Sequence, residues 1–123
     1  MSHTMAPSRD GKYVILKVVG EINSRSAMRQ NLEAHGMGKK MGINRYLVDV
    51  TKARNTDSIT ESYDFAYSDM KRTEGIDIHA RVATLASPGD HSHDFIETVA
   101  LNSGLNVKIF TDPELAREFL TKD

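Results

Sequence analysis

The chain has 123 residues, of which 39% are hydrophobic, and its 16 basic and 17 acidic residues give a net charge of -1. This length suits one domain with one core, and no apolar run approaches the roughly 20 residues of a membrane span. The balanced charge gives no bulk attraction to nucleic acid, and the absence of cysteine excludes disulfides and thiolate chemistry. Residues 1–5 lack the features of a secretory signal, so we expect one cytoplasmic domain spanning 1–123, with 1–11 as an edge strand or a disordered start.

The first two strands are predicted from short-range signals. Residues 4–8 form a candidate strand, and Pro7 confines it to the edge of a sheet because proline cannot donate to a ladder. The Asp-Gly pair at 10–11 suits a hairpin turn. Residues 13–19 are rich in β-branched side chains and form the first strong strand, which Gly20 is expected to stop.

A helix is predicted after this strand. Ser24 is a candidate N-cap, because its short polar side chain can accept a hydrogen bond from a free amide of the first turn. The helix is expected to run to about His35, since Gly36 and Gly38 are natural terminators.

The strand predicted at 45–51 is the element around which the rest of the chain is arranged. Leu47, Val48 and Val50 form a short apolar run, typical of a strand buried on both faces inside a parallel sheet. A polar loop is expected over 52–57. Loops at the carboxyl end of a central parallel strand are where α/β domains keep their sites.

The second half of the chain repeats this order of strand and helix. Ser58 and Glu61 have the spacing of a capping box and predict a helix to about Thr73. Further cap signals and β-branched runs predict a strand at 81–86, a helix capped by Asp90, a strand at 106–110, and a helix beginning near 111–114 with Leu115, Ala116, Phe119 and Leu120 facing inward. The sum is an α/β domain, a mainly parallel sheet of four or five strands with four helices.

Two segments of this pattern resemble a STAS domain, the SpoIIAA-like fold of anti-sigma-factor antagonists. They are Gly20-Glu21-Ile22 after a β-branched strand and Leu47-Val48-Asp49-Val50 before a capped helix. The carboxyl half is similar to the bacterial SpoIIAA-like family of small stand-alone proteins, also described as STAS/Sec14-related, through residues 93–100, Gly104, 107–110 and Phe119-Leu120. The resemblance covers 12–121 and implies a SpoIIAA-like fold, a protein partner and, through its Sec14 side, a candidate apolar-ligand pocket.

The resemblance also bears on a phosphorylation switch. In classical antagonists, a partner kinase phosphorylates the second serine of an Asp-Ser-Ser-Gly motif. Asp57 and Ser58 match the first two positions, whereas Ile59 and Thr60 replace the second serine and the glycine. The resemblance therefore implies a regulatory, non-enzymatic domain without this switch. Phosphate on Ser58 or Thr60 would still be favoured by the helix dipole, although helix capping alone explains Ser58.

Topology gathers the candidate site residues. In a parallel sheet the loops that follow the strands meet at one edge, so we expect seven polar residues to share a rim and to bind a protein partner. They are Glu21, Asn23, Asp57, Ser58, Thr60, His91 and His93.

Two constellations suggest other functions. His91 and His93, with carboxylates nearby, suggest a metal-dependent hydrolase, but residues two apart at a helix start diverge by about 200°, and we predict no metal or cofactor. An aromatic set could line a pocket for a lipid-like molecule, although aromatic residues at helical spacing normally belong to the core. This set is Tyr63, Phe65, Tyr67 and Phe95.

The resulting prediction is a non-enzymatic regulatory or interaction domain that acts through a protein partner. A protein that binds a small apolar ligand is the first alternative, and the hydrolase is the second. Native mass spectrometry separates them, because it would show a bound lipid or a bound zinc ion. Exposed apolar residues leave a homodimer open, and the net charge of -1 argues against a nucleic-acid partner.

Overall fold

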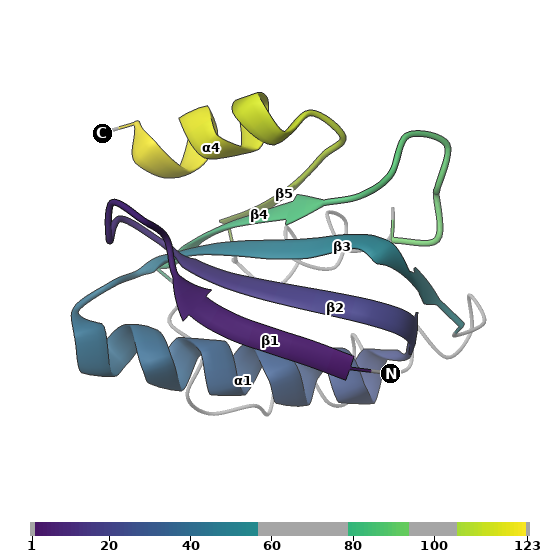
Figure 1. The fold of residues 1–123 in the computed structure, drawn as a ribbon, viewed down its shortest axis with the longest axis horizontal. Coiled ribbons are helices and arrows are strands. Elements are labelled where there is room, and N and C mark those ends of the chain that lie inside the picture. Colours follow the sequence, from purple (N-terminus) through teal and green to yellow (C-terminus); the bar gives the residue numbers. More distant parts are fainter. Residues whose placement is uncertain (1, 57–78, 94–105, 123) are drawn as a thin grey trace.

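The computed structural model describes residues 2–56, 79–93 and 106–122, which form a five-stranded mixed sheet with helices on both of its faces (Figure 1). The strands are β1 (Ser2–Pro7), β2 (Val14–Ile22), β3 (Arg45–Asn55), β4 (Arg81–Leu85) and β5 (Asn106–Phe110), in that order across the sheet. The first strand is antiparallel to its neighbour, and the remaining pairs are parallel. The predicted sheet, including its amino-terminal edge strand, is confirmed.

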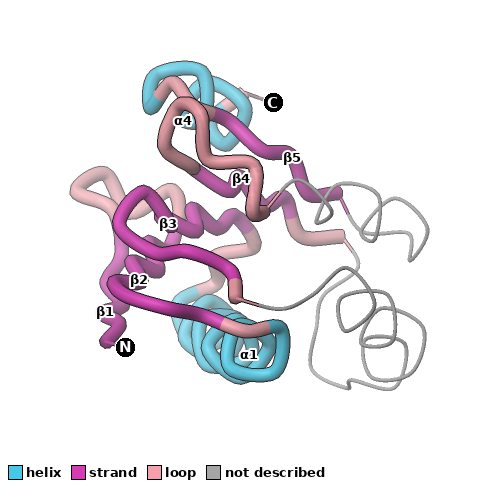
Figure 2. The backbone as a smooth tube through the Cα atoms, turned by 90° about the vertical axis from the view of Figure 1, so that its right-hand side faces the viewer, coloured by secondary structure: helices cyan, strands magenta, loops and turns pink. Residues whose placement is uncertain are grey.

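The described helices cover opposite faces of this sheet. Helix α1 (Ser24–Met41) packs on β2 and β3, whereas α4 (Pro113–Thr121) packs on β3, β4 and β5 from the other side (Figure 2). The core beneath α1 is the larger one and includes Val14, Leu16 and Val18, which are all buried. The helices predicted over 58–73 and after Asp90 fall largely outside the described residues.

Strand β2 continues past the point where a glycine was expected to stop it. Gly20 has a φ of 99°, a conformation that glycine adopts without steric cost. The register between β2 and β3 shifts between Lys17 and Val19, where β3 contains one residue more than β2, and the two strands then resume pairing. The prediction that Gly20 ends the strand is wrong, because β2 runs on to Ile22.

Helix α1 begins one residue earlier and ends six residues later than its sequence predicts. The N-cap is Asn23, not Ser24: its side chain accepts from the backbone amide of Ser26, and the Ser26 hydroxyl accepts from the Asn23 amide. The helix passes through Gly36 and Gly38 and ends at Met41, where Gly42 adopts the left-handed conformation with a φ of 71°. The two internal glycines therefore do not terminate it.

Strand β3 is also longer than predicted, and the loop expected over 52–57 is strand as far as Asn55. The extension of β2 supplies the reason, because residues 19–22 pair with 52–55. Burial alternates along β3, with Tyr46, Val48 and Val50 buried on the α1 side. Leu47 on the other face is only half-buried, so the expected burial on both faces holds in part.

Helix α4 is fixed at both of its ends. Asp112 caps its start by accepting from the Glu114 amide, 2.9 Å away. At its end, the Arg45 guanidinium donates to the Leu120 carbonyl at 2.8 Å, and that of Arg81 donates to the Phe119 carbonyl at 2.9 Å. Positive groups are favourable at the carboxyl end of a helix, where its last carbonyls lack partners.

The inward face of α4 is narrower than predicted. Ala116 and Leu120 are buried against Ala83 of β4, and Phe119 packs beside them. Leu115 is 52% exposed, so its predicted inward orientation is wrong. Leu115 therefore lies on the solvent side of the helix, away from the face that carries Ala116 and Leu120.

Candidate functional site

The candidate site is built on the part of β3 that outruns β4. Strand β4 pairs with β3 only as far as Asp49, whereas β3 continues to Asn55. Backbone groups of alternate residues in a strand point toward the same neighbour. Thr51, Ala53 and Asn55 therefore present hydrogen-bonding groups along an edge where β4 does not reach.

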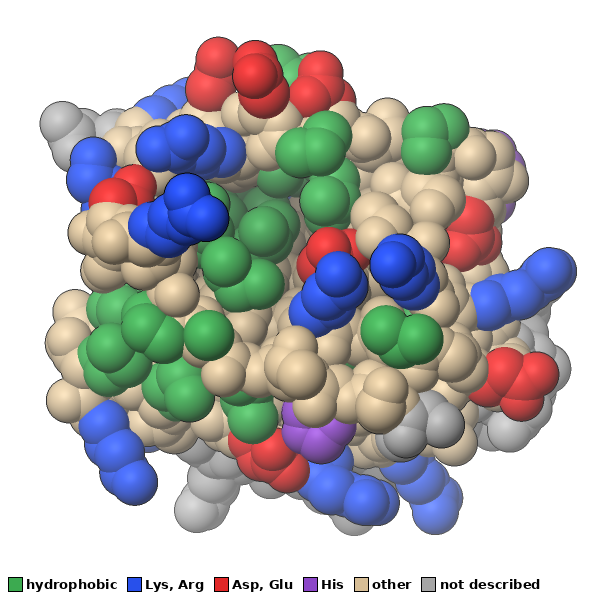
Figure 3. All heavy atoms as spheres, in the orientation of Figure 1, with side chains coloured by type: hydrophobic (Ala, Val, Ile, Leu, Met, Phe, Trp, Pro, Cys, Tyr) green, Lys and Arg blue, Asp and Glu red, His purple; other side chains and the backbone are tan. Residues whose placement is uncertain are grey.

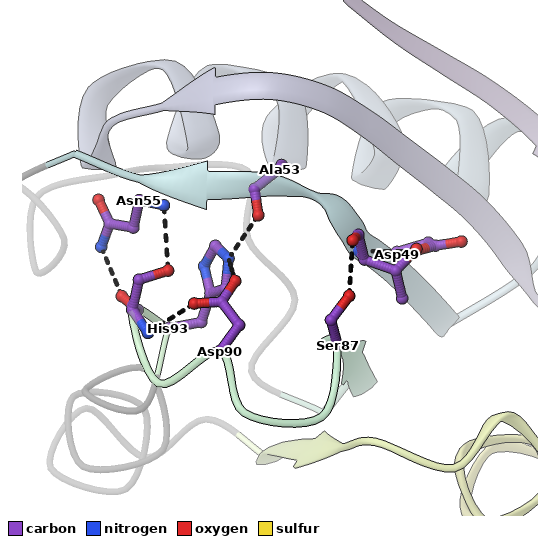
Figure 4. Close-up of polar contacts among 8 residues, drawn as sticks. Asp49, Ala53, Asn55, Ser87, Asp90 and His93 are labelled. Atoms are coloured by element: carbon purple, nitrogen blue, oxygen red, sulfur yellow. Dashed lines mark hydrogen bonds and ion pairs between the residues drawn. The ribbon is translucent and has the colours of Figure 1, made fainter.

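The segment that follows β4, residues 87–93, occupies this edge, and we call it the 87–93 loop. The Ser87 hydroxyl donates to the Thr51 carbonyl at 2.7 Å, and His93 Nε2 donates to the Ala53 carbonyl at 3.2 Å (Figure 4). Farther along the edge, Asn55 forms two hydrogen bonds with Ser92. Its backbone amide donates to Ser92 Oγ at 3.2 Å, and its side-chain amide donates to the Ser92 carbonyl at 3.1 Å. Loop side chains thus take the place of a pairing strand.

A tight turn sets the direction of the loop. The Asp90 amide donates to the Ser87 carbonyl at 3.0 Å, with Pro88 and Gly89 between them. Proline at the second position and glycine at the third, here with a φ of 86°, are the preferences of a type II turn. This turn leads the chain back toward β3 (Figure 4).

Asp90 fixes the carboxyl half of the loop. Its Oδ1 accepts from the Ser92 amide at 3.0 Å, and its Oδ2 lies 3.6 Å from His93 Nε2. Hydrogen bonds from the Ser92 backbone amide and the Ser92 hydroxyl lower the pKa of Asp90 and outweigh the opposing effect of burial, and His93 and Arg54 lower it further by smaller amounts. The ionised carboxylate is the form that holds the loop together.

We expect Asp90→Asn to loosen the loop at neutral pH. Because the folded-state pKa is lowered, ionised Asp90 stabilises the protein above about pH 4, and this contribution is lost as the pH falls through the lowered value. The Asn55 amide reports the effect through its hydrogen exchange: exchange should be faster in the variant at pH 7, and the difference should vanish in acid. Asp10→Asn, whose carboxyl accepts from Ser8 in the β1–β2 hairpin, is the matched control. Equal protection of Asn55 in wild type and Asp90→Asn at pH 7 would contradict this role.

The carboxyl ends of β2 and β3 and the 87–93 loop meet at one edge, as topology predicted. The Thr56 amide donates to the Ile22 carbonyl at 2.9 Å, which joins the ends of β2 and β3. Glu21, Asn23 and His91 are exposed there. His93 is only 3% exposed, so it anchors the loop rather than facing a partner.

The remaining predicted site residues lie outside the described part of the chain. They are Asp57, Ser58 and Thr60 of the rim and Tyr63, Phe65, Tyr67 and Phe95 of the aromatic set. Conversely, sequence reasoning missed Ala53, Asn55, Ser87 and Ser92. Had the predicted strand extended past Thr51, its period of two would have placed Thr51, Ala53 and Asn55 on one edge.

The two histidines of the loop are placed differently. His91 is exposed, whereas His93 is buried with Nε2 on the Ala53 carbonyl. Among the described residues, no three His, Asp or Glu side chains gather as metal ligands. Within the same residues, no helix has the length and apolar character needed to cross a membrane.

Comparisons with solved structures identify the fold of the chain. No family model and no curated protein matches the chain. A protein of the DUF3478 family with a SpoIIAA-like fold from Shewanella loihica is similar in structure, with 21% identity, coverage of 97% of this chain and 92% of the other, and a TM-score of 0.52. An anti-sigma factor antagonist from Mycobacterium paratuberculosis is also similar, with 13% identity, coverage of 97% and 94%, and a TM-score of 0.53. The chain therefore has the SpoIIAA-like fold that its sequence predicted.

Proposed function

We propose that this chain is a non-enzymatic regulatory domain that binds a protein partner at the described part of the rim, Glu21, Asn23 and His91, together with the exposed residues Arg54 and Thr56 beside it. The observation that carries the proposal is the attachment of the 87–93 loop to β3. The side chains of Ser87, Ser92 and His93 form hydrogen bonds with backbone groups of β3, so the loop is held in place in the absence of a partner. A surface fixed in advance costs less ordering on binding.

The fold supports this reading. A similar structure is that of an anti-sigma factor antagonist, a class of regulator that acts on another protein. The chain differs from the classical motif at Ile59 and Thr60, so we infer that recognition does not require a phosphate on this segment. The described rim mixes Glu21 with Arg54 and His91, which suits a polar, reversible protein interface.

Site-specific photo-crosslinking in the native host tests the proposal. Two variants are made, with a photo-reactive amino acid in place of Arg54 or of His91. Both should form an adduct with the same protein, because both positions are exposed beside each other at this edge. The same amino acid in place of Lys40 or Asn44, exposed at the opposite end of α1 and β3, is the matched control. Adducts of equal yield from the controls, or none from the rim, would contradict the proposal.

A further inference from the structure

Among the described elements, α4 alone covers the second face of the sheet, over part of its width. Helix α4 packs on β3, β4 and β5, and the outer face of β1 and β2 lies beside it. The space-filling view shows hydrophobic side chains gathered in a hollow between α4 and β1, with Lys and Arg side chains along it (Figure 3).

The floor of this hollow is apolar and carries lysines, with the half-buried Asp49 as the cross-strand neighbour of Lys17. Because Val14, Leu16 and Val18 are buried under α1, the alternate residues Ile15, Lys17 and Val19 point to the other face. Val19 is 39% exposed, although it is a large β-branched residue. The exposed Lys52 pairs with Val19 in the neighbouring strand and adds a second positive charge.

The outer face of α4 has the complementary chemistry. Glu114, Leu115 and Glu118 are exposed, and Leu115 is more exposed than any other large hydrophobic residue of the described chain, at 52%. The space-filling view shows acidic side chains gathered at the top, where α4 lies (Figure 3). The helix therefore presents one apolar residue and two carboxylates, with Arg117 lying 3.6 Å from the Asp10 carboxylate of the β1–β2 hairpin. The hollow beside it presents an apolar residue, two amines and the Asp49 carboxylate, so an excess of positive charge faces an excess of negative charge.

We propose that two copies of this chain pair about a twofold axis, with α4 of each lying in the β1–β2 hollow of the other. A ridge and a hollow side by side on one face are self-complementary when a copy is turned over onto another, which is the condition for a closed, isologous dimer. Leu115 of one copy then meets Val19 and Ile15 of the second. Glu114 and Glu118 meet Lys17 and Lys52, and the two α4 helices form one layer between two sheets.

The small size of the two surfaces sets the expected strength. One helix of nine residues against two strands is less than the interface of a stable complex, so we expect a reversible dimer with a Kd of about 10–100 μM. Because the facing charges are solvent-accessible, association should weaken as salt rises.

Sedimentation velocity over a range of concentrations tests the proposal through a charge exchange. Lys17→Glu/Lys52→Glu and Glu114→Lys/Glu118→Lys should each be monomeric, because like charges then face each other twice in the dimer. An equimolar mixture of the two variants should dimerise again, because each α4 then meets a hollow of opposite charge. A general loss of folding cannot produce this rescue.

Apolar variants supply the second measurement. Val19→Asp and Leu115→Asp should each weaken association by about tenfold or more, while Met41→Asp, at an exposed residue of α1 on the far side of the sheet, should not. A wild type that stays monomeric, a mixture that fails to dimerise, or a dimer unaffected by Val19→Asp would overturn the proposal. Crosslinking at Arg54 and His91 is read separately, so either proposal can fail while the other stands.

Discussion

Replacing Gly38 with alanine is expected to destabilise the protein by about 2 kcal/mol, even though alanine is the better helix former. A Cβ at Gly38 would lie 2.6 Å from the Ile43 carbonyl oxygen and 2.8 Å from Tyr46 Cζ, and it would also meet the Tyr46 hydroxyl. Tyr46 is 2% exposed and stacks on His35, with ring centroids 4.2 Å apart, so it has little room to move. Urea unfolding measures the loss.

Gly36→Ala is the matched control, two residues earlier in the same helix. No atom lies within 4 Å of a Cβ built at Gly36, and the residue is exposed. Alanine there should raise the free energy of unfolding by about 1 kcal/mol through helix propensity alone. If both variants shifted stability in the same direction, close packing of Gly38 on Tyr46 would not be the reason for the glycine.

Leu120→Ala should cost about 3 kcal/mol, the usual range for a fully buried leucine. Leu120 is 1% exposed and shares a small cluster with Ala83 and Ala116, so truncation leaves a void that few neighbours can fill. The same helix end carries the carbonyls that Arg45 and Arg81 hold. We therefore expect α4 to lose its protection from hydrogen exchange before the sheet does.

Leu115→Ala provides the comparison within one helix and one residue type. Leu115 is 52% exposed, so its truncation should change stability by less than about 0.5 kcal/mol. The measurement is made at a protein concentration well below the proposed dimer range, so that association does not contribute. Similar losses at Leu115 and Leu120 would show that α4 does not pack as described.

The sequence predicted well whatever is local or strictly periodic. The β-branched runs identified β4 at 81–86 and β5 at 106–110 to within a residue. Pro7 marked β1 as an edge strand, and Asp112 with Pro113 marked the start of α4. These signals act within a few residues of the backbone that they shape, so no knowledge of the tertiary fold was needed.

Two of the errors come from tertiary contacts. Gly38 looks like a helix terminator in the sequence, but the absence of a side chain there leaves room for Tyr46, a residue of the next strand. The length of β3 depended on the unpredicted extension of β2 past Gly20. A one-dimensional pattern does not contain either partner.

The candidate site divides in the same way. Parallel topology brought Glu21, Asn23 and His91 to one edge, as predicted. The anchors of the loop were missed, because the Thr51 and Ala53 carbonyls are backbone groups that leave no mark on residue type. For the same reason, His93 was predicted as an exposed rim residue, whereas the structure shows it buried and bonded to the Ala53 carbonyl.

The edge of β3 that the 87–93 loop covers has a consequence for solubility. An uncovered strand edge is a template on which another chain can add a strand and begin to aggregate. Here that edge is shielded by the side chains of Ser87, Ser92 and His93 instead of by a continuous ladder. Among the described residues, resistance to strand addition at this edge therefore rests on the side chains of Ser87, Ser92 and His93, and we expect a substitution at one of them to increase aggregation while the core stays intact.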